Sequence, residues 1–243
     1  MEQRNIITEK NPKSPISEAY RTLRTNIQFS NIDEDIKSIL ITSSGSGEGK
    51  STTLTNLGVT IAQSGKNVLL IDSDLRKPRM HQYFQLPNMR GLTTAISANV
   101  DYKEIVCQTH IENLDILTSG PVPPNPSELL GSKKMKEFLK RVKNDYDTVL
   151  IDTPPVGIVT DAAVLSAVVD GVLLVCASGQ VDVDAAKSAK KLLETVKANI
   201  LGVILTKIPI NEGRYYKYSY YNSFYEESVK YEKSVFSKEE EVV

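Results

Sequence analysis

The sequence predicts an α/β domain in which helices cover both faces of a doubly wound, mostly parallel sheet. Short apolar, β-rich runs recur along the chain, at residues 38–42, 67–71, 114–117, 148–151, 172–175 and 200–205. Segments with helical spacing separate most of these runs, and such an alternation produces parallel strands joined by crossover helices. Hydrophobic residues make up 40% of the 243 residues and charged residues 24%, which suits a globular domain with a sizeable core.

Two helix starts are marked by residue type. Ser14 and Pro15 open a segment whose spacing predicts a helix over about residues 14–29. Further along, Asn125 is a good N-cap residue, the next residue is a proline suited to a first turn, and Glu128 stands where a capping box requires an acid. This second pattern predicts one helix that continues to about residue 143.

The character of the chain changes after residue 207. Residues 214–233 are polar, rich in tyrosine and without clean periodicity. The sequence therefore predicts a folded domain over residues 1–207 and a flexible tail over residues 208–243. Seven of the eleven tyrosines of the chain lie in this tail, namely Tyr215, Tyr216, Tyr218, Tyr220, Tyr221, Tyr225 and Tyr231.

Composition and charge exclude several classes of function. The net charge is −1, so the overall balance predicts no nucleic-acid partner. The polar N-terminus is not a signal peptide, and no apolar run is long enough to span a membrane. Cys107 and Cys176 have no metal-binding spacing, which suits a reducing cytoplasm.

A strand, a glycine-rich turn and a helix start follow one another over residues 39–52. Glycines in the turn let the backbone approach phosphate, and the helix N-terminus adds positive potential. Lys50 can reach the β- and γ-phosphates, and the Ser51 hydroxyl can ligate Mg²⁺. The motif departs from its full form because Ser44 replaces the first glycine. It predicts a P-loop NTPase fold that binds ATP and Mg²⁺ through Ser46, Gly47, Glu48, Gly49, Lys50, Ser51 and Thr52.

Three aspartates follow predicted strands. Asp72 and Asp74 follow the second strand, and Asp152 follows the fourth. Ligands of open parallel sheets bind at the carboxyl ends of strands, so we expect all three near the phosphates. Residues two apart share one face of a strand, so Asp72 and Asp74 would point the same way if the strand extends that far. Asp152 and Ser51 are expected to hold Mg²⁺. Lys50 is expected to act in catalysis, and the sequence leaves open how Asp72 and Asp74 divide the magnesium and general-base roles.

Together these motifs resemble a known family. The loop, the pattern Asp72-x-Asp74-x-Arg76 and the pattern Asp152-x-x-Pro155 are similar to those of the bacterial protein-tyrosine kinases of capsular and exopolysaccharide synthesis, the BY-kinases. The segment SGPVPPNPSELL at residues 119–130 and the tyrosine-rich tail are also typical of that family. The resemblance extends over nearly the whole chain.

The resemblance implies an ATP-dependent protein-tyrosine kinase that phosphorylates its own tail tyrosines between subunits and regulates capsular or exopolysaccharide synthesis and export. Glu18, Arg21 and Arg24 match the family's Glu-x-x-Arg-x-x-Arg oligomerisation motif, which implies a ring-like homo-oligomer. On a helix these three residues form a charged stripe that would face outward. In related kinases a residue after the last strand, commonly asparagine, contacts the adenine, and Thr206 takes that place here.

The resemblance also implies partners and a location. Kinases of this kind occur either fused to a membrane-spanning modulator or as separate chains, and this chain resembles the separate form. A membrane-spanning modulator of the polysaccharide co-polymerase type would then hold the cytoplasmic chain at the inner face of the membrane. A cognate tyrosine phosphatase would reverse the modification. The sequence does not indicate which polysaccharide is made.

Two alternatives share the nucleotide motifs. Partition and septum-positioning ATPases act as nucleotide-switched binding proteins, and they carry an additional lysine near the start of the loop, where this chain has Gly45. A metabolic ATP-dependent synthetase of the same fold would need no tail with seven tyrosines. Both differences favour the kinase.

Overall fold

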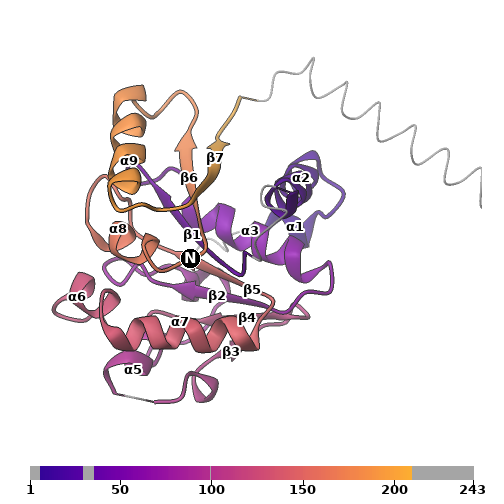
Figure 1. The fold of residues 1–243 in the computed structure, drawn as a ribbon. Coiled ribbons are helices and arrows are strands. Elements are labelled where there is room, and N and C mark those ends of the chain that lie inside the picture. Colours follow the sequence, from indigo (N-terminus) through magenta and orange to yellow (C-terminus); the bar gives the residue numbers. More distant parts are fainter. Residues whose placement is uncertain (1–5, 30–35, 99, 210–243) are drawn as a thin grey trace, which may run out of the picture. The chain divides into compact units, whose positions relative to one another are not determined.

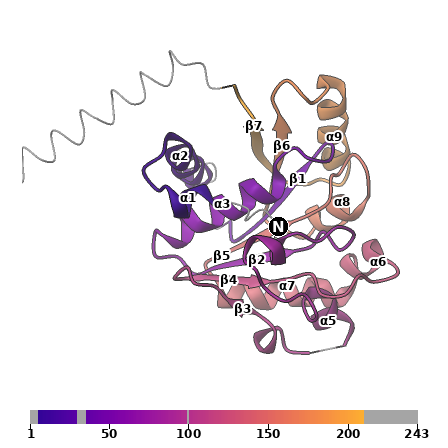
Figure 2. The same cartoon turned by 180° about the vertical axis from the view of Figure 1, so that it is seen from behind.

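The computed structural model describes residues 6–29, 36–98 and 100–209, which form a seven-stranded sheet with helices on both faces (Figures 1 and 2). The strand order is β3-β4-β2-β5-β1-β6-β7, and only β3 runs antiparallel to its neighbour. The strands are β1 (Ser38–Ser43), β2 (Val68–Asp72), β3 (Cys107–Gln108), β4 (Leu114–Leu117), β5 (Thr148–Asp152), β6 (Gly171–Ala177) and β7 (Ile200–Thr206). The predicted fold class is confirmed.

The described helices divide into two layers. The first layer contains α1 (Ile7–Lys10), α2 (Pro15–Phe29), α3 (Lys50–Ala62) and α4 (Met80–Tyr83). The second contains α5 (Leu92–Ser97), α6 (Pro126–Leu130), α7 (Lys133–Asp145), α8 (Asp161–Ser166) and α9 (Val183–Thr195). A short 3-10 helix spans Tyr102–Glu104. None of the helices in the described residues has the combination of length and apolar character that crossing a membrane requires.

Each face of the sheet has its own core. Successive residues of a strand point to opposite faces, so Leu40 packs with α5 to α9, whereas Ile39 and Ile41 pack with α2, α3 and α4. The central strands β1, β2, β5 and β6 are buried on both faces, which explains why they appear in the sequence as continuous apolar runs, whereas the edge strand β7 leaves Val203 and Leu205 exposed. On the first face α3 covers the sheet, and α1 and α2 lie against α3 (Figure 1).

The structure corrects two predictions of local structure. The predicted helix over residues 125–143 is two helices, because Gly131 ends α6 and Ser132 begins α7, its hydroxyl accepting a hydrogen bond from Met135 N at 3.2 Å. The Asn125 side chain makes no cap; its Nδ2 donates to Glu128 Oε2 instead. The two-residue strand β3 was not predicted, because two residues are too few to show a period.

The compact unit that carries these elements comprises Met1–Lys207, and a second unit comprises Ile208–Val243. The seven tail tyrosines lie outside the described residues, as does every residue from 210 onward.

Candidate functional site

The loop at residues 44–49 joins the end of β1 to the first residue of α3. Gly47 and Gly49 have φ angles of 77° and 98°, in the left-handed region that glycine adopts without a steric cost. A Cβ added at Gly47 would meet no other described atom within 4 Å, so this side of the loop is open. The loop therefore turns its backbone toward a space at the N-terminus of α3, as a phosphate-binding loop requires.

The buried Glu48 side chain stabilises the loop through hydrogen bonds within it. Its Oε1 accepts hydrogen bonds from the Ser44 hydroxyl at 2.7 Å and from the Gly45 backbone N–H. Among the described residues, Oε2 has no hydrogen-bond partner. The carboxylate thus closes the loop between its first and fifth residues. Gly45, the position of the additional lysine in the septum-positioning ATPases, is engaged in this closure.

A residue of the last strand also stabilises the loop by a hydrogen bond. The hydroxyl of Thr206, at the end of β7, donates to the backbone carbonyl of Glu48 at 2.6 Å. The Thr206 side chain also lies against Gly49, where an added Cβ would be 3.4 Å from Thr206 Cγ2. Thr206 takes the position at which related kinases commonly have an asparagine that contacts the adenine, and in this structure its side chain lies against the loop that would hold the phosphates. The sequence carries no signal for this contact, because 157 residues separate Gly49 from Thr206.

Ser51 and Asp152 come together across the sheet edge. The Ser51 hydroxyl donates to Asp152 Oδ2 at 2.6 Å, which joins the first turn of α3 to the end of β5. Asp152 is buried, and its Oδ1 has no hydrogen-bond partner among the described residues. Lys50 is 9% exposed and lies close enough to Asp152 for its charge to lower that carboxyl's pKa.

The donor set fits Mg²⁺ held together with a nucleotide. Within the described part of the chain there is no cluster of three or more His, Cys, Asp or Glu side chains suited to a metal. Mg²⁺ is usually bound by one or two carboxylates together with phosphate oxygens and water, so a hydroxyl and one buried carboxylate oxygen are a sufficient protein contribution. Ser51 Oγ and Asp152 Oδ1 are the atoms that meet this requirement.

Asp72 lies beside Asp152, because the two residues are register partners in β2 and β5. The Asp72 carboxylate is buried and accepts three backbone hydrogen bonds, at Oδ2 from Arg79 N and Met80 N and at Oδ1 from Asp74 N. It therefore orders the turn that follows β2. The two bonds to Oδ2 occupy both of its lone pairs, whereas Oδ1 accepts only one, so a further interaction is still open to Oδ1.

Asp74 lies two residues beyond the end of β2. Strand β2 ends at Asp72, so Asp74 is not held on the same face by strand geometry. Its side chain is half-buried, and Oδ1 accepts a hydrogen bond from Lys77 N at 2.9 Å. The condition for the shared face was a longer strand, and that condition is not met.

The electrostatics of the paired carboxyls follow from their burial. Burial first, and then the charge of Asp152, raise the pKa of Asp72 to about 8. Burial also raises the pKa of Asp152 to about 6, although the Ser51 hydrogen bond and the Lys50 charge act in the lowering direction. Two adjacent buried carboxyls with raised pKa values would be stabilised in their ionised form by a bound cation, so they are suited to binding one.

Arg76 pairs with an acid of the same chain, although its side chain remains 40% exposed. Its Nε donates to Asp161 Oδ2 at 2.8 Å and its Nη2 to Asp161 Oδ1 at 3.0 Å. The Ser127 hydroxyl donates to the same Oδ1 at 2.6 Å, and Arg76 Nη2 also approaches Ser127 Oγ at 3.2 Å. We call Arg76, Ser127 and Asp161 the acid-centred clamp. The sequence did not indicate it, since its members lie in three separate segments.

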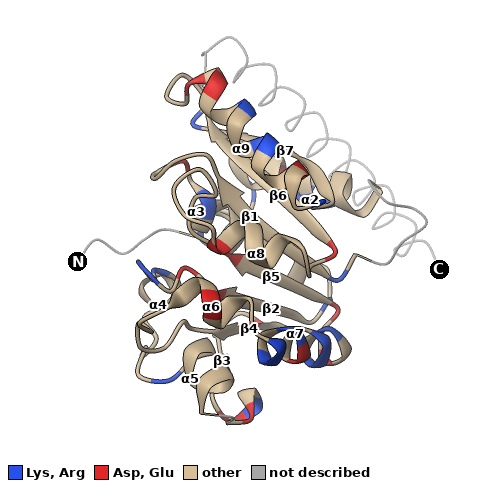
Figure 3. Ribbon diagram, turned by 60° about the vertical axis from the view of Figure 1, so that its left-hand side comes forward, with Lys and Arg blue, Asp and Glu red and all other residues tan. Residues whose placement is uncertain are grey.

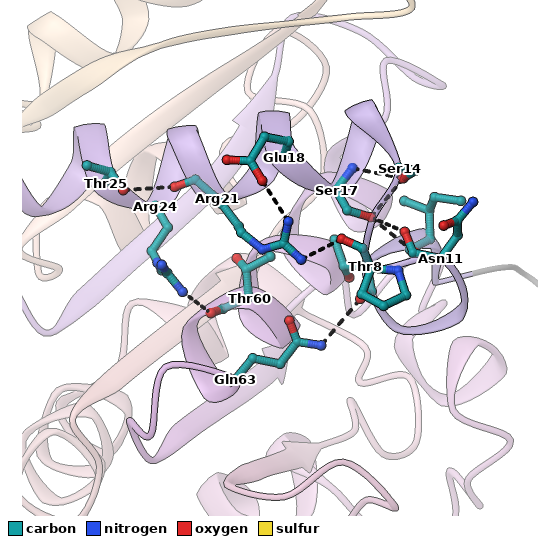
Figure 4. Close-up of polar contacts among 12 residues, drawn as sticks. Thr8, Asn11, Ser14, Ser17, Glu18, Arg21, Arg24, Thr25, Thr60 and Gln63 are labelled. Carbon is teal, nitrogen blue, oxygen red and sulfur yellow. Dashed lines mark hydrogen bonds and ion pairs between the residues drawn. The ribbon is translucent and has the colours of Figure 1, made fainter. Parts of the chain in front are cut away.

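The charged stripe of α2 is partly turned toward the chain itself (Figure 4). Arg21 Nη1 donates to Glu18 Oε2 at 2.7 Å, and Arg24 Nη1 donates to the backbone carbonyl of Thr60 at 2.7 Å. The Thr60 carbonyl lies in the last turn of α3, where carbonyls lack intrahelical partners, and the long arginine side chain can reach it. The prediction that the whole stripe faces outward is thus wrong for Arg24. Glu18 and Arg21 keep side-chain exposures of 45% and 32%.

The apolar side of α2 packs mostly on the domain. Leu23 and Ile27 pack against the core formed with α3, whereas Ile16, at the start of the helix, remains exposed. Ser14 Oγ accepts a hydrogen bond from Ser17 N at 3.1 Å, which explains why the helix begins there.

Comparison with known proteins gives a consistent result. A family model described as an AAA domain matches residues 36–201, a range that contains the loop and the three aspartates. The tyrosine-protein kinase YwqD of Bacillus subtilis (strain 168) is 47% identical over 221 residues, which cover 91% of this chain and 92% of that protein. The putative tyrosine-protein kinase CapB of Staphylococcus aureus is 44% identical over 209 residues, which cover 86% of this chain and 92% of that protein.

Solved structures separate the two main alternatives. The chimerical protein CapA2B2 matches with a TM-score of 0.82 and 43% identity, over 84% of this chain and 90% of that one. The septum site-determining protein MinD of Pyrococcus horikoshii OT3, complexed with Mg-ADP, matches with a TM-score of 0.60 and 26% identity, over 70% of each chain. The kinase domain of the Escherichia coli tyrosine kinase ETK matches with a TM-score of 0.80 and 31% identity, over 87% of this chain and 84% of that one. The septum protein therefore shares the P-loop NTPase fold, but CapA2B2 and the ETK kinase domain match more of the chain and at higher identity.

Proposed function

Because this chain belongs to the bacterial tyrosine-protein kinases, we propose that its phosphate-binding loop holds ATP with Mg²⁺ and that it phosphorylates the tail tyrosines of a neighbouring subunit. The observation that carries the proposal is the Ser51–Asp152 pair beside Lys50 and Asp72 at the start of α3. The seven tail tyrosines of the sequence supply acceptors on the same polypeptide.

The proposed roles follow from the positions of the side chains. The loop backbone and Lys50 bind the phosphates, and Lys50 balances the charge that grows on the transferred group. Ser51 Oγ and Asp152 Oδ1 hold the metal, with Asp72 fixed beside them. Bound Mg²⁺ would supply the positive charge that neutralises the phosphate oxygens. Its presence would also hold both buried carboxyls in the ionised form.

Asp74 is the better candidate for the general base. A tyrosine hydroxyl has an ordinary pKa of about 10, so a carboxylate must take its proton as the oxygen attacks. The Asp72 oxygens accept three backbone N–H groups, whereas Asp74 is half-buried and accepts one. Asp74 is therefore freer to accept the proton at a carboxylate oxygen, and Asp72 serves the metal side.

We further propose the biological setting implied by the relatives. The chain would assemble as a ring-like homo-oligomer through Glu18 and Arg21, with Arg24 contributing when it leaves the Thr60 carbonyl. A membrane-spanning modulator would hold it at the inner face of the membrane, and a tyrosine phosphatase would remove the phosphates. The process regulated would be capsular or exopolysaccharide synthesis and export.

Incubation with γ-labelled ATP and Mg²⁺, followed by identification of the phosphorylated residue, tests the chemistry. The proposal requires phosphotyrosine on residues 215–231. Release of free phosphate without labelled protein would instead support the nucleotide-switched ATPase. Light scattering of the Arg21→Ala chain tests the assembly, with Lys10→Ala, on the neighbouring helix α1, as a control for the loss of one positive charge.

A further inference from the structure

The carboxyl ends of β2, β4 and β5 lie on the side of the loop away from β6 and β7. Thr206 contacts the loop from the β7 side. The terminal phosphate would be held on the other side, near Lys50, Ser51 and Asp152. An acceptor hydroxyl must approach from beyond the terminal phosphate, in line with the bond that breaks. It therefore enters over the segments that follow β2, β4 and β5.

The acid-centred clamp joins these three segments. Arg76 belongs to the turn after β2, Ser127 to the first turn of α6 after the β4 loop, and Asp161 to the first turn of α8 after the β5 loop. Thr160 Oγ1 adds a contact to Ser127 Oγ at 3.3 Å. Figure 3 shows α4 and α6 at the same end of the strands as the start of α3.

The clamp is built around a fully buried acid. The Asp161 side chain is 0% exposed, and both of its oxygens are engaged by Arg76 in a bidentate pair. Burial alone would raise the pKa of Asp161, but the hydrogen bonds from Arg76 and Ser127 lower it below its ordinary value. Such a paired, ionised acid fixes the geometry of the residues around it more tightly than a solvent-exposed pair does.

The clamp connects the turn after β2 with the loops after β4 and β5, over which the acceptor would enter. Arg76 stands two residues after Asp74, so it anchors the turn that carries the proposed base. The loops after β4 and β5 each expose one large apolar side chain, Val122 at 63% and Ile158 at 60%. These are surfaces on which an aromatic ring can pack.

We infer that Arg76, Ser127 and Asp161 are positioning residues that hold Asp74 and the loops after β4 and β5 in the arrangement that receives the acceptor tyrosine. They act through the residues they hold: among the described residues, their side-chain hydrogen bonds join them to one another and to Thr160. The inference rests on the proposed kinase site, and it predicts a selective defect: the acceptor binds more weakly while the nucleotide binds as before.

Steady-state kinetics with two acceptors test this. One acceptor is the full chain carrying Lys50→Met, which is itself inactive but keeps its tail, and the other is a random copolymer of glutamate and tyrosine. Ser127→Ala removes the hydroxyl that donates to Asp161, and Arg76→Lys keeps the charge but loses the bidentate geometry. Ser127→Thr restores the hydroxyl. Ser64→Ala, which removes a hydroxyl bonded to the Ile61 carbonyl at the far end of α3, is the matched control.

We expect Ser127→Ala to raise the KM for the acceptor about fivefold, because one hydrogen bond is lost. Arg76→Lys should raise this KM about tenfold or more, because the bidentate pair of hydrogen bonds is lost. The dissociation constant of Mg·ADP should change less than about twofold, and Ser127→Thr should recover most of the loss. An unchanged acceptor KM, or parallel weakening of acceptor and Mg·ADP, would overturn the inference. Labelling of the copolymer but not of the Lys50→Met chain would count against the tail as acceptor, and the copolymer KM would still decide the role of the clamp.

Discussion

The Ser51 hydroxyl donates a 2.6 Å hydrogen bond to Asp152 Oδ2, and the other oxygen of that carboxylate is buried without a partner among the described residues. An unpaired buried carboxylate oxygen is costly to leave unsatisfied. The cost is accounted for if the oxygen has a cation to bind during function. The two strands that end at Asp72 and Asp152 place a second carboxylate beside it.

Replacing Lys50 by methionine should lower phosphotransfer at least about a hundredfold, the loss typical when one charge-stabilising donor is removed from a transition state. The fold should survive, since methionine fills a similar volume, and the melting temperature should shift by no more than about 4 °C. Lys66→Met, at an exposed position, is the control. Activity within a few-fold of the unmodified chain would remove Lys50 from the mechanism.

Asparagine substitutions of the three aspartates should differ in whether they weaken binding of Mg·ADP or reduce turnover. Asp152→Asn should weaken binding of Mg·ADP more than binding of ADP in a chelating buffer, because the metal loses an anionic ligand. Asp74→Asn should leave Mg·ADP affinity nearly unchanged and reduce turnover, as expected for a general base. Asp72→Asn should resemble Asp152→Asn. Isothermal titration of the three variants decides this, and three equal affinities would refute the assigned roles.

Thr206 should control the phosphate-binding loop through its hydroxyl. Thr206→Val keeps the shape of the side chain but removes the donor to the Glu48 carbonyl, so nucleotide affinity should fall about fivefold, the effect of one hydrogen bond. Thr206→Ser keeps the donor and should bind nearly as well as the unmodified chain. Equal affinities for the valine and serine variants would show that the hydroxyl plays no part.

The Arg76–Asp161 pair should leave a signature in the pH dependence of stability. In the unmodified chain the lowered pKa of Asp161 contributes stability above the pKa of the unfolded state, and this is lost as pH falls through the folded-state pKa. In Arg76→Ala the buried acid loses its main partner, so burial raises the pKa of Asp161 above its ordinary value. The ionised form of Asp161 then destabilises the fold instead of stabilising it. The variant's loss of unfolding free energy should be greatest near pH 7 and should shrink toward pH 4.

The size of that loss should be about 2 kcal/mol at pH 7, less than for a fully buried pair because the Arg76 side chain is 40% exposed. Lys77→Ala, one residue along and also exposed, provides a control for the loss of one positive charge. Denaturant unfolding at several pH values measures both variants. A loss that does not vary between pH 4 and pH 7 would mean that Asp161 does not depend on Arg76.

Local patterns in the sequence were sufficient for the sheet and the loop. Each long strand is a continuous apolar run, and the loop is a contiguous motif, so both can be recognised without tertiary information. The contacts of Thr206 with Glu48 and of Arg76 with Asp161 join residues far apart in the chain, and no local period reports them. The helix break at Gly131 and Ser132 did have a signal, a glycine followed by a capping serine, which the continuous spacing of apolar residues concealed.

The α2 stripe shows a different limit. Its spacing correctly predicts a helix, but spacing gives only the direction in which each side chain leaves the helix. Arg24 has a flexible stem that can reach back to the unpaired Thr60 carbonyl, so its position depends on a neighbour that the sequence does not identify.

Transfer between subunits is tested most directly by mixing two chains, one without a working site and the other without acceptor tyrosines in its tail. One chain carries Lys50→Met and keeps its tail; the other has an intact site, with its seven tail tyrosines replaced by phenylalanine. With labelled ATP and Mg²⁺, neither chain alone should acquire phosphotyrosine. The mixture should acquire it, and only on residues 215–231 of the Lys50→Met chain. Failure to label that chain, while the intact site still phosphorylates a glutamate–tyrosine copolymer, would contradict transfer to a neighbour's tail.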